Sequence, residues 1–445
     1  MHTRREILIR SLVGAGTLLL PGVLASTGCA HRRSANDRIQ IAQIGCGRMG
    51  FSDCSSLLAI NEARVVALCD VDAKRLNEAH RQVVNYYRQR GEQDVSCKTY
   101  DDYRHIMADQ TIDAVVISTP DHWHALPVAA ALLAGKAVYV QKPLALTMAE
   151  TRMLKQLAHD RGGIVQIGSQ QRSGRYFRLA CQLVRSGAVG RLHTVRIGLN
   201  HDAAGPELMP QAVPANLDYD RWLGPAHAPS DFPYIEKRVH SQQDLNERPG
   251  WLRVEDFCLG MITGWGSHHI DIAHLAMGCE LGGPTAITAK AEFPRKGIHN
   301  VHGQYHAELA YPGEVTVILD HSYPNGIRFE GSDGWIFVQR GEGSGTGRPL
   351  QASKPELLKT PLPPSMNHYE DWIVAIRANR QPIAPLDQGA HTGAACIAIW
   401  VGMKLGRPVR FDPVAMEFPG DDDANRLCVR SARSGYDLEA LIRNG

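Results

Sequence analysis

The chain has 445 residues, which is enough for two or three domains. Hydrophobic residues make up 44% of the chain and charged residues 21%, so neither a disordered protein nor a fibre fits. Basic and acidic residues nearly balance, at 48 against 46, and give a net charge of +2. This balance, together with the absence of a long lysine and arginine run, argues against a nucleic-acid partner.

The first 34 residues have the form of an export signal, so we leave residues 1–34 out of the predicted fold. Arg4 and Arg5 form a twin-arginine pair, and an apolar segment interrupted by glycines and a proline follows. That segment is too short and too rich in glycine for a stable spanning helix. We therefore expect the twin-arginine export machinery to carry the folded protein to the periplasm. The sequence leaves open cleavage after Ala30 or a lipid anchor on Cys29.

Residues 39–50 combine a predicted buried strand with a glycine-rich turn. Three glycines follow the apolar strand in the spacing G-x-G-x-x-G. They permit a tight turn, a close approach of the backbone to a pyrophosphate, and close packing of helix on strand. The helix that follows would point its N-terminal N–H groups at the phosphates. We expect the cofactor to contact the whole loop: Gly45, Cys46, Gly47, Arg48, Met49 and Gly50.

A carboxylate stands where such a unit binds ribose. The apolar run Val65–Cys69 predicts a second buried strand and ends at Asp70, about 20 residues past the glycines. A carboxylate there repels a 2′-phosphate and so favours NAD over NADP. Strand, glycine turn, helix, strand and acid in this order predict a dinucleotide-binding unit, and the alternative is a glycine turn of purely structural meaning.

Strands and helices keep alternating to about residue 170, which predicts a doubly wound parallel sheet of the Rossmann type. The further strands are expected at 97–99, 114–118, 137–140 and 164–167. Ligands of such sheets bind at the carboxyl ends of the strands, where polar residues gather here. Those that we expect to reach the cofactor are Thr119, Pro120, His122, Gln141, Lys142 and Gln170.

The pattern changes after Gly190. A long irregular stretch, 201–257, is of a length that is usually functional. Five candidate strands between residues 285 and 339 have no helices between them and predict a mixed or antiparallel sheet. The predicted domains are a cofactor-binding domain over 35–170, a second α/β domain with a large open sheet over 171–413, and a surface tail over 414–445.

Lys142 is the first catalytic candidate. Pro143 keeps Lys142 out of the α region, so its side chain can project from the strand end over the cleft. An ammonium group there can hydrogen-bond a substrate hydroxyl while hydride leaves carbon for nicotinamide. The alternative is an ordinary surface lysine.

His268 is the second candidate, within a Gly-Trp-Gly-Ser-His-His stretch. Histidine is the side chain best placed to accept a proton near neutral pH. If residues 267–277 are helical, Asp271 shares a face with His268, so we include Asp271 as its catalytic partner. The alternative is a core histidine with backbone partners. The spacing lacks a tight metal-ligand signature, and we predict no metal site.

The glycine loop, Thr119-Pro120 and Lys142-Pro143 together resemble the Gfo/Idh/MocA family of glucose–fructose oxidoreductase and inositol dehydrogenase. The resemblance runs from about residue 38 to 413, and residues 368–372 (His-Tyr-Glu-Asp-Trp) resemble its exported members. It implies a Rossmann domain that binds NAD(P), and a C-terminal domain whose open sheet faces the active site. It also implies oxidation of a ring hydroxyl in a sugar or cyclitol, and a homo-oligomer.

Two positions depart from the family pattern. Gln141 replaces the usual glutamate before Lys142, so the lysine loses a neighbouring carboxylate. Gly264 stands where the family's acid would assist His268, and we expect Asp271 or Glu255 to substitute for it.

Three functions stay open. The first is an exported NAD-dependent oxidoreductase acting on a sugar, sugar derivative or cyclitol. The second is an NAD-dependent glycoside hydrolase that transiently oxidises C3 and eliminates the glycosidic oxygen. The third is a nucleotide- or sugar-binding protein without turnover. Because free NAD is scarce outside the cytoplasm, export predicts a tightly bound cofactor that is loaded before transport.

Overall fold

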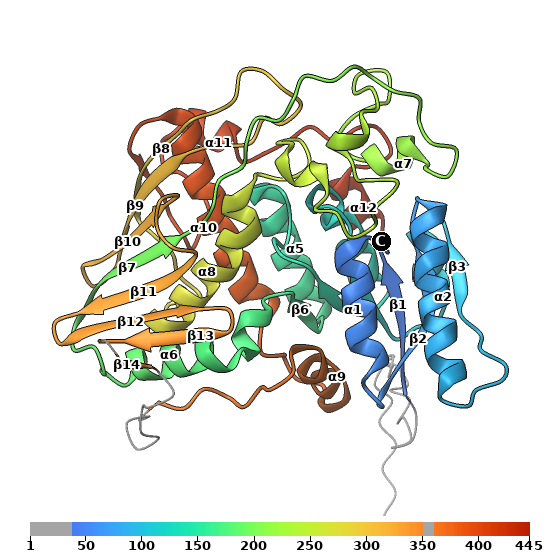
Figure 1. Cartoon of the computed structure of the whole chain (residues 1–445), viewed down its shortest axis with the longest axis horizontal. Helices are drawn as coiled ribbons and strands as arrows, with labels where there is room; N and C mark the ends of the chain where they lie inside the picture. The colour runs from blue at the N-terminus through green and yellow to red at the C-terminus, as the bar shows by residue number, and fades with distance from the viewer. Residues whose placement is uncertain (1–37, 347, 350–359) are drawn as a thin grey trace, which may run out of the picture. The chain divides into compact units, whose positions relative to one another are not determined.

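The first half of the chain builds a six-stranded parallel sheet in the computed structural model, which describes residues 38–346, 348–349 and 360–445 (Figure 1). The predicted export signal and Cys29 lie outside the described residues. The strand order is β3-β2-β1-β4-β5-β6. Successive strands are therefore added on one side of β1 as far as β3 and on the other side from β4 onward, as in a Rossmann fold. The strands are β1 (Ile39–Ile44), β2 (Ala63–Cys69), β3 (Lys98–Tyr100), β4 (Ala114–Ile117), β5 (Ala137–Val140) and β6 (Val165–Ile167).

Helices connect these strands, and the central strands are buried, as their uninterrupted apolar runs predict. The connecting helices are α1 (Arg48–Leu58), α2 (Ala73–Gln89), α3 (Tyr103–Ala108), α4 (Ala125–Leu133) and α5 (Met148–Arg161). The prediction of an N-terminal doubly wound sheet is confirmed.

A second, nine-stranded sheet follows, in the order β14-β13-β12-β11-β7-β10-β9-β8-β15. Strands β7 and β10 pair in parallel and the other neighbours pair antiparallel, which confirms the predicted mixed sheet. Its strands are β7 (Leu192–Gly198), β8 (Ala286–Ala291), β9 (Tyr305–Tyr311), β10 (Val315–Asp320), β11 (Gly326–Gly331), β12 (Gly334–Gln339), β13 (Glu342–Gly345), β14 (Arg348–Pro349) and β15 (Val409–Arg410).

Helices cover one face of this sheet and leave the other face open (Figure 1). Residues of β9 alternate strictly between buried and exposed, as expected for a strand with one covered face. The covering helices are α6 (Arg175–Arg185), α8 (Met261–Met277) and α10 (Leu386–Leu405). None of the helices within the described ranges is long and apolar enough to cross a bilayer.

Residues 201–257, which we call the insertion, contain one short α-helix, α7 (Tyr219–Leu223), and two 3₁₀ turns. The insertion has a small hydrophobic core of its own, in which Trp222 and Phe257 lie edge to face at 4.9 Å. Its path is therefore fixed by packed aromatic side chains although it has little regular structure.

The end of the chain returns to the first sheet. Helix α9 (His368–Ala378) buries Trp372 completely against Tyr139 of β5. The predicted surface tail is partly wrong, because Phe418 and Leu438 are buried and α12 (Leu438–Asn444) packs on α4. Isolated apolar residues among charged ones give no periodic signal, which is why the sequence did not reveal this packing. The remaining helix is α11 (Asp422–Arg426).

Candidate functional site

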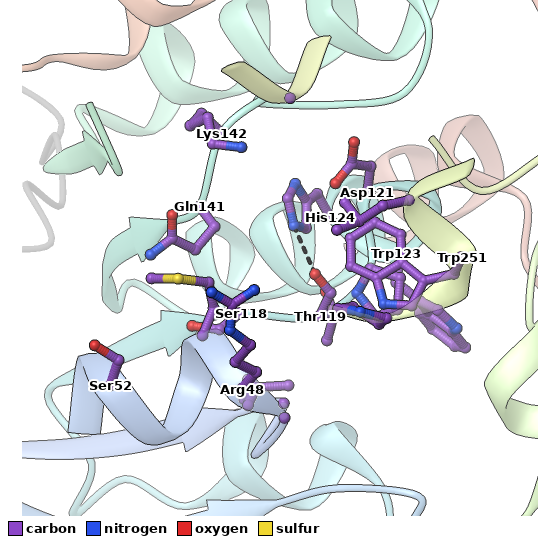
Figure 2. Close-up of a pocket in the computed structure, with 18 of the residues that line it drawn as sticks. Arg48, Ser52, Ser118, Thr119, Asp121, Trp123, His124, Gln141, Lys142 and Trp251 are labelled. Atoms are coloured by element: carbon purple, nitrogen blue, oxygen red, sulfur yellow. Dashed lines mark hydrogen bonds between the residues drawn. The ribbon is translucent and has the colours of Figure 1, made fainter. Parts of the chain in front are cut away.

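A cavity of about 810 Å³ opens at the carboxyl ends of the parallel strands (Figure 2). Its wall includes the glycine loop and the ends of β2, β4 and β5. The first turns of α8, the start of α6 and part of the insertion complete the wall. Both sheets and the insertion thus contribute to a single cavity at the edge where ligands of Rossmann folds bind.

The three glycines of the loop meet different surroundings. Gly45 has φ +85°, and a Cβ added there would lie 2.7 Å from the Ser118 carbonyl carbon. A Cβ on Gly50 would collide with the Gly45 carbonyl oxygen. A Cβ on Gly47 would meet no protein atom within 4 Å, although this residue lines the cavity. Packing therefore explains two of the glycines, and room for a ligand explains the third.

The start of α1 fits a pyrophosphate. Gly47 is the N-cap residue of α1 and provides no side-chain cap, so the first N–H groups of the helix remain available to an anion. Arg48 and Met49 are exposed and line the cavity beside it. The residues present therefore fit the diphosphate of a dinucleotide.

Asp70 lies at the end of β2, also in the cavity wall. Its carboxylate accepts hydrogen bonds from the backbone N–H groups of Cys46, at 2.6 Å, and Asp72, at 2.8 Å. Burial raises the pKa of Asp70, and the two N–H bonds oppose that rise. Each carboxylate oxygen retains a lone pair for a ribose hydroxyl. Cys46 and Gly50 are buried and do not line the cavity, so they shape the loop without facing the ligand.

A carboxylate that the sequence analysis missed lies behind Gln141. Asp53 of α1 is fully buried and accepts hydrogen bonds from Gln141 Nε2, at 2.8 and 2.9 Å. It also accepts from the hydroxyls of Ser118 and Tyr369, both at 2.6 Å. Burial raises its pKa, which these hydrogen bonds oppose. A glutamate at position 141 would bring a second carboxylate against Asp53, so the amide of Gln141 suits this site.

Lys142 and His268 line the same cavity, as the sequence suggested. Figure 2 shows Lys142 extending from the strand end toward the side of the cavity that holds Asp121 and His124. Burial lowers the pKa of His268 well below its usual range, and the positive charges of Lys142 and Arg340 lower it further. His268 is therefore a neutral imidazole at neutral pH and can accept a proton.

Neither carboxylate expected to assist His268 reaches the cavity, which corrects both expectations. Asp271 is 1% exposed and forms a two-pronged salt bridge with Arg172, at 2.6 and 2.7 Å. Glu255 pairs with Lys404 at 2.7 Å. A Cβ at Gly264 would meet nothing within 4 Å, so that position contributes open space instead of an acid.

Residues after β4 divide between the cavity and the core. Thr119, Pro120 and His124 line the cavity. His124 joins two strand ends, since its ring nitrogens lie 2.7 Å from the Pro143 carbonyl oxygen and 2.9 Å from that of Thr119. His122, predicted to reach the cofactor, instead packs on Phe257 at 4.8 Å, because the 3₁₀ turn directs it into the core of the insertion.

Two further polar residues complete this wall. Gln170 lines the cavity and donates to the Tyr139 hydroxyl at 3.1 Å. Asp121, which the sequence analysis did not select, is buried there, and its Oδ2 has no hydrogen-bond partner in the described chain. Burial raises its pKa, while the charges of His124 and Lys142 lower it. No group of three or more potential metal ligands occurs among the described residues.

The fold and the cavity define a dinucleotide-binding Rossmann protein with a second α/β domain. Residues 39–169 match the model of an oxidoreductase family with an NAD-binding Rossmann fold, and residues 196–438 match that family's C-terminal alpha/beta domain. The chain belongs to this family, Gfo/Idh/MocA.

Individual relatives are distant. The chain is 29% identical over 170 residues to myo-inositol 2-dehydrogenase of Thermotoga maritima, which covers 38% of this chain and 47% of that protein. It is 28% identical over 158 residues to a glycosyl hydrolase family 109 protein of Shewanella putrefaciens, covering 35% and 34% of the two chains. The chain thus spans about half the length of the former and about a third of the latter.

Solved structures show the same fold at low sequence identity. GenD2 from gentamicin A biosynthesis, in complex with NAD, superposes with a TM-score of 0.59 at 17% identity. The match covers 90% of this chain and all of GenD2 (100%). At this identity the similarity establishes the fold.

The loop glycines give a matched pair of variants. Gly47→Ala adds a methyl group into open space, so we expect unfolding free energy to change by less than about 1 kcal/mol. NAD affinity should fall at least about tenfold, because the methyl group obstructs the pyrophosphate. Gly50→Ala should destabilise the fold by about 1–3 kcal/mol, because its methyl group meets backbone. Urea unfolding and NAD titration measure both effects, and full NAD affinity in Gly47→Ala would contradict the assignment.

The buried salt bridge gives a second prediction. Asp271→Ala leaves the Arg172 guanidinium buried without its carboxylate, which should destabilise the protein by about 3–5 kcal/mol in urea unfolding. Asp387→Ala removes a half-buried carboxylate at the surface that pairs with His159 and should cost no more than about 1 kcal/mol. Wild-type stability with lost turnover in Asp271→Ala would instead restore its catalytic assignment.

Proposed function

We propose that the protein is an NAD-dependent oxidoreductase that oxidises a ring hydroxyl of a sugar, sugar derivative or cyclitol. One observation carries this proposal. A single cavity is lined both by the glycine loop and Asp70 and by Lys142 and His268. The family of the chain and its similarity to inositol dehydrogenases support the same class of reaction.

Lys142 and His268 have separate roles in such an oxidation. NAD, when bound along the loop, supplies the acceptor for hydride. The Lys142 ammonium donates a hydrogen bond to the substrate hydroxyl and stabilises negative charge that develops on its oxygen. His268, neutral because it is buried beside two cations, accepts the hydroxyl proton.

A second candidate is a glycoside hydrolase with resident NAD. Similarity to the Shewanella putrefaciens protein favours this reaction. The part of the cavity wall that the insertion forms also favours it, because that part could contact a second sugar. In this reaction, oxidation at C3 acidifies the proton at C2, the glycosidic oxygen leaves, and hydride and water then return. The same lysine and histidine serve its first step. A binding protein without turnover is the third candidate.

Tight retention of the cofactor is part of the proposal, and the insertion supports it. Asp72 lies two residues after Asp70, the carboxylate that we expect to bind ribose, and Asp72 is 1% exposed. It accepts hydrogen bonds from three side chains of the insertion, Asn216 at 2.7 Å, His240 at 2.9 Å and Gln242 at 3.0 Å. Burial opposes its charge, but the bonds from His240 and Gln242 outweigh this and lower the pKa of Asp72.

This anchor holds the insertion across the ribose end of the cavity. Arg221 of the insertion pairs with Asp101 at 3.0 Å, beyond β3, and Trp222 and Trp251 line the cavity. A dinucleotide seated on the loop would therefore lie beside this anchored segment, and contacts with it would slow release of the dinucleotide. A tightly held NAD suits an exported enzyme, because the enzyme would bind NAD in the cytoplasm and keep it during transport.

Export and assembly complete the proposal. The twin-arginine pair supports transport by the corresponding machinery to the periplasm, with Cys29 as the site of an optional lipid anchor. The open face of the nine-stranded sheet offers a surface for a homo-oligomer, because exposed residues alternate along β8 and β9.

Retention is tested by NAD dissociation. His240→Ala removes one of the three side-chain bonds to Asp72, and we expect the rate of NAD release to rise about tenfold, the equivalent of about 1.4 kcal/mol. His227→Ala is the control, because His227 lies in the same insertion and pairs with Asp256. Stopped-flow displacement of bound NAD by an excess of NADH measures both rates. Equal rates of NAD release from the two variants would contradict a role of His240 in retaining NAD.

Turnover is tested on holoenzyme purified with its NAD. Free sugars, cyclitols and aryl glycosides are screened together, and net NADH formation supports the oxidoreductase. Aglycone release without net NADH favours the hydrolase, and bound NAD without any turnover favours the binding protein. Lys142→Ala should reduce turnover at least about 100-fold while NAD stays bound. Lys98→Ala is the control, because Lys98 is an exposed residue of β3 that pairs with Asp109 and lies outside the cavity wall. Full activity of Lys142→Ala would refute the site.

A further inference from the structure

Several arginines line the cavity that holds His268. Most arginines of the cavity wall have an acidic partner: Arg75 pairs with Asp72, Arg104 with Asp102, Arg221 with Asp101 and Arg248 with Asp202. Arg175 and Arg340 line the same wall, and neither forms an ion pair with any described residue. Arg48 is also unpaired, but it belongs to the glycine loop.

Arg340 is positioned at the substrate end. It follows β12 at the turn into β13 and lies over the Trp265 ring at 4.4 Å. Trp265 in turn contacts the His268 ring edge to face at 5.9 Å. The charge of Arg340 acts on His268, whose pKa it helps to lower together with burial and Lys142. The guanidinium is thus held beside the predicted base and is still exposed to the cavity.

The start of α6 contributes a second cation and a polar side chain without a partner. Arg175 is the first residue of α6, whose N-cap Gly174 provides no side-chain cap. Gln171, just before it, lines the cavity and is 3% exposed. Neither its Nε2 nor its Oε1 has a hydrogen-bond partner in the described chain. A buried amide without partners indicates that a polar ligand completes its hydrogen bonding.

The charge balance of the cavity wall is positive, because eight lysine and arginine side chains line it against five carboxylates. Lys142, Arg175 and Arg340 face the space, and Asp121 is the buried acid of the same wall. Glu247 lies on the exposed part of the insertion. A neutral sugar would leave both free guanidinium groups without a counter-charge, whereas a carboxylate matches the fork of N–H donors that arginine presents.

We propose that the substrate is an acidic sugar, with a carboxylate bound by Arg340 and Arg175, so that these arginines set the substrate specificity. This inference rests on the proposed function, and it names the substrate class of that site. Gln171 would donate from its amide to the same substrate. The bound carboxylate would also offset the positive charge around His268, which makes the imidazole a stronger base when the correct substrate is present.

The experiment compares pairs of sugars that differ only at C6, where a carboxylate replaces a hydroxymethyl group. Holoenzyme is assayed with glucuronate and galacturonate against glucose and galactose, and glucose 6-phosphate separates carboxylate recognition from general attraction of anions. We expect kcat/KM for a hexuronate to exceed that for its neutral counterpart at least about tenfold. Only the hexuronate reaction should slow as ionic strength rises.

A matched pair of variants assigns the preference to Arg340. Arg340→Gln should raise KM for the hexuronate at least about tenfold and leave the neutral sugar unchanged within about twofold. Arg328→Gln is the control. Arg328 stacks on Trp335 at 4.2 Å, as Arg340 stacks on Trp265, but Arg328 lies outside the cavity wall. Calorimetric titration of each variant loaded with NADH, which cannot accept a hydride, measures hexuronate binding without turnover.

The outcomes separate this inference from the proposed function. A higher kcat/KM for neutral sugars would overturn the proposal of an acidic substrate and leave the proposed oxidoreductase function intact. An equal rise in KM for both sugars in Arg340→Gln would have the same meaning. Preference for glucose 6-phosphate would replace the carboxylate with a phosphate and also overturn the inference. No turnover of any sugar, acidic or neutral, would overturn the proposed function itself.

Discussion

The buried carboxylate of Asp53 is the point through which the cofactor loop and the candidate catalytic lysine are connected. Gln43 donates to the Gly45 carbonyl oxygen at 2.9 Å and to Ser118 Oγ at 3.0 Å. Ser118 donates to Asp53, and Asp53 holds the amide of Gln141 immediately before Lys142. Asp53 has no cationic partner among the described residues, and four donor contacts satisfy its carboxyl group in this core. The loop, the ends of β4 and β5, and α9 are therefore held in one geometry.

The second constraint is the anchoring of the insertion. A segment of this length without regular structure has a high conformational entropy when free. Its aromatic core and the three side chains that converge on Asp72 fix it over the ribose end of the cavity. The same carboxylate caps α2 by accepting from Lys74 N–H at 2.9 Å. The first residues after β2 thus order a helix and a distant segment together, beside Asp70, the carboxylate that we expect to bind ribose.

Local patterns predicted what local sequence determines. The parallel strands, the glycine turn and the position of Asp70 each depend on residues close in the chain, and the structure has them where they were expected. The errors come from contacts between distant residues. Asp271 was expected beside His268 on one helix face, but Arg172, 99 residues earlier, takes its carboxylate. His122 was expected at the cofactor, but it meets the Trp222 carbonyl oxygen, 100 residues later.

The missing acid at Gly264 and the free arginines are two aspects of one electrostatic arrangement. A histidine base is usually assisted by a carboxylate, which stabilises the imidazolium that forms. Here burial and the charges of two cations, Lys142 and Arg340, lower the pKa of His268, so the protein by itself disfavours that imidazolium. A negative charge is needed at the moment of proton transfer, and no described residue at Gly264, Asp271 or Glu255 provides it. If the substrate brings the carboxylate, it supplies the stabilisation only when correctly bound, and specificity and catalysis then depend on the same interaction.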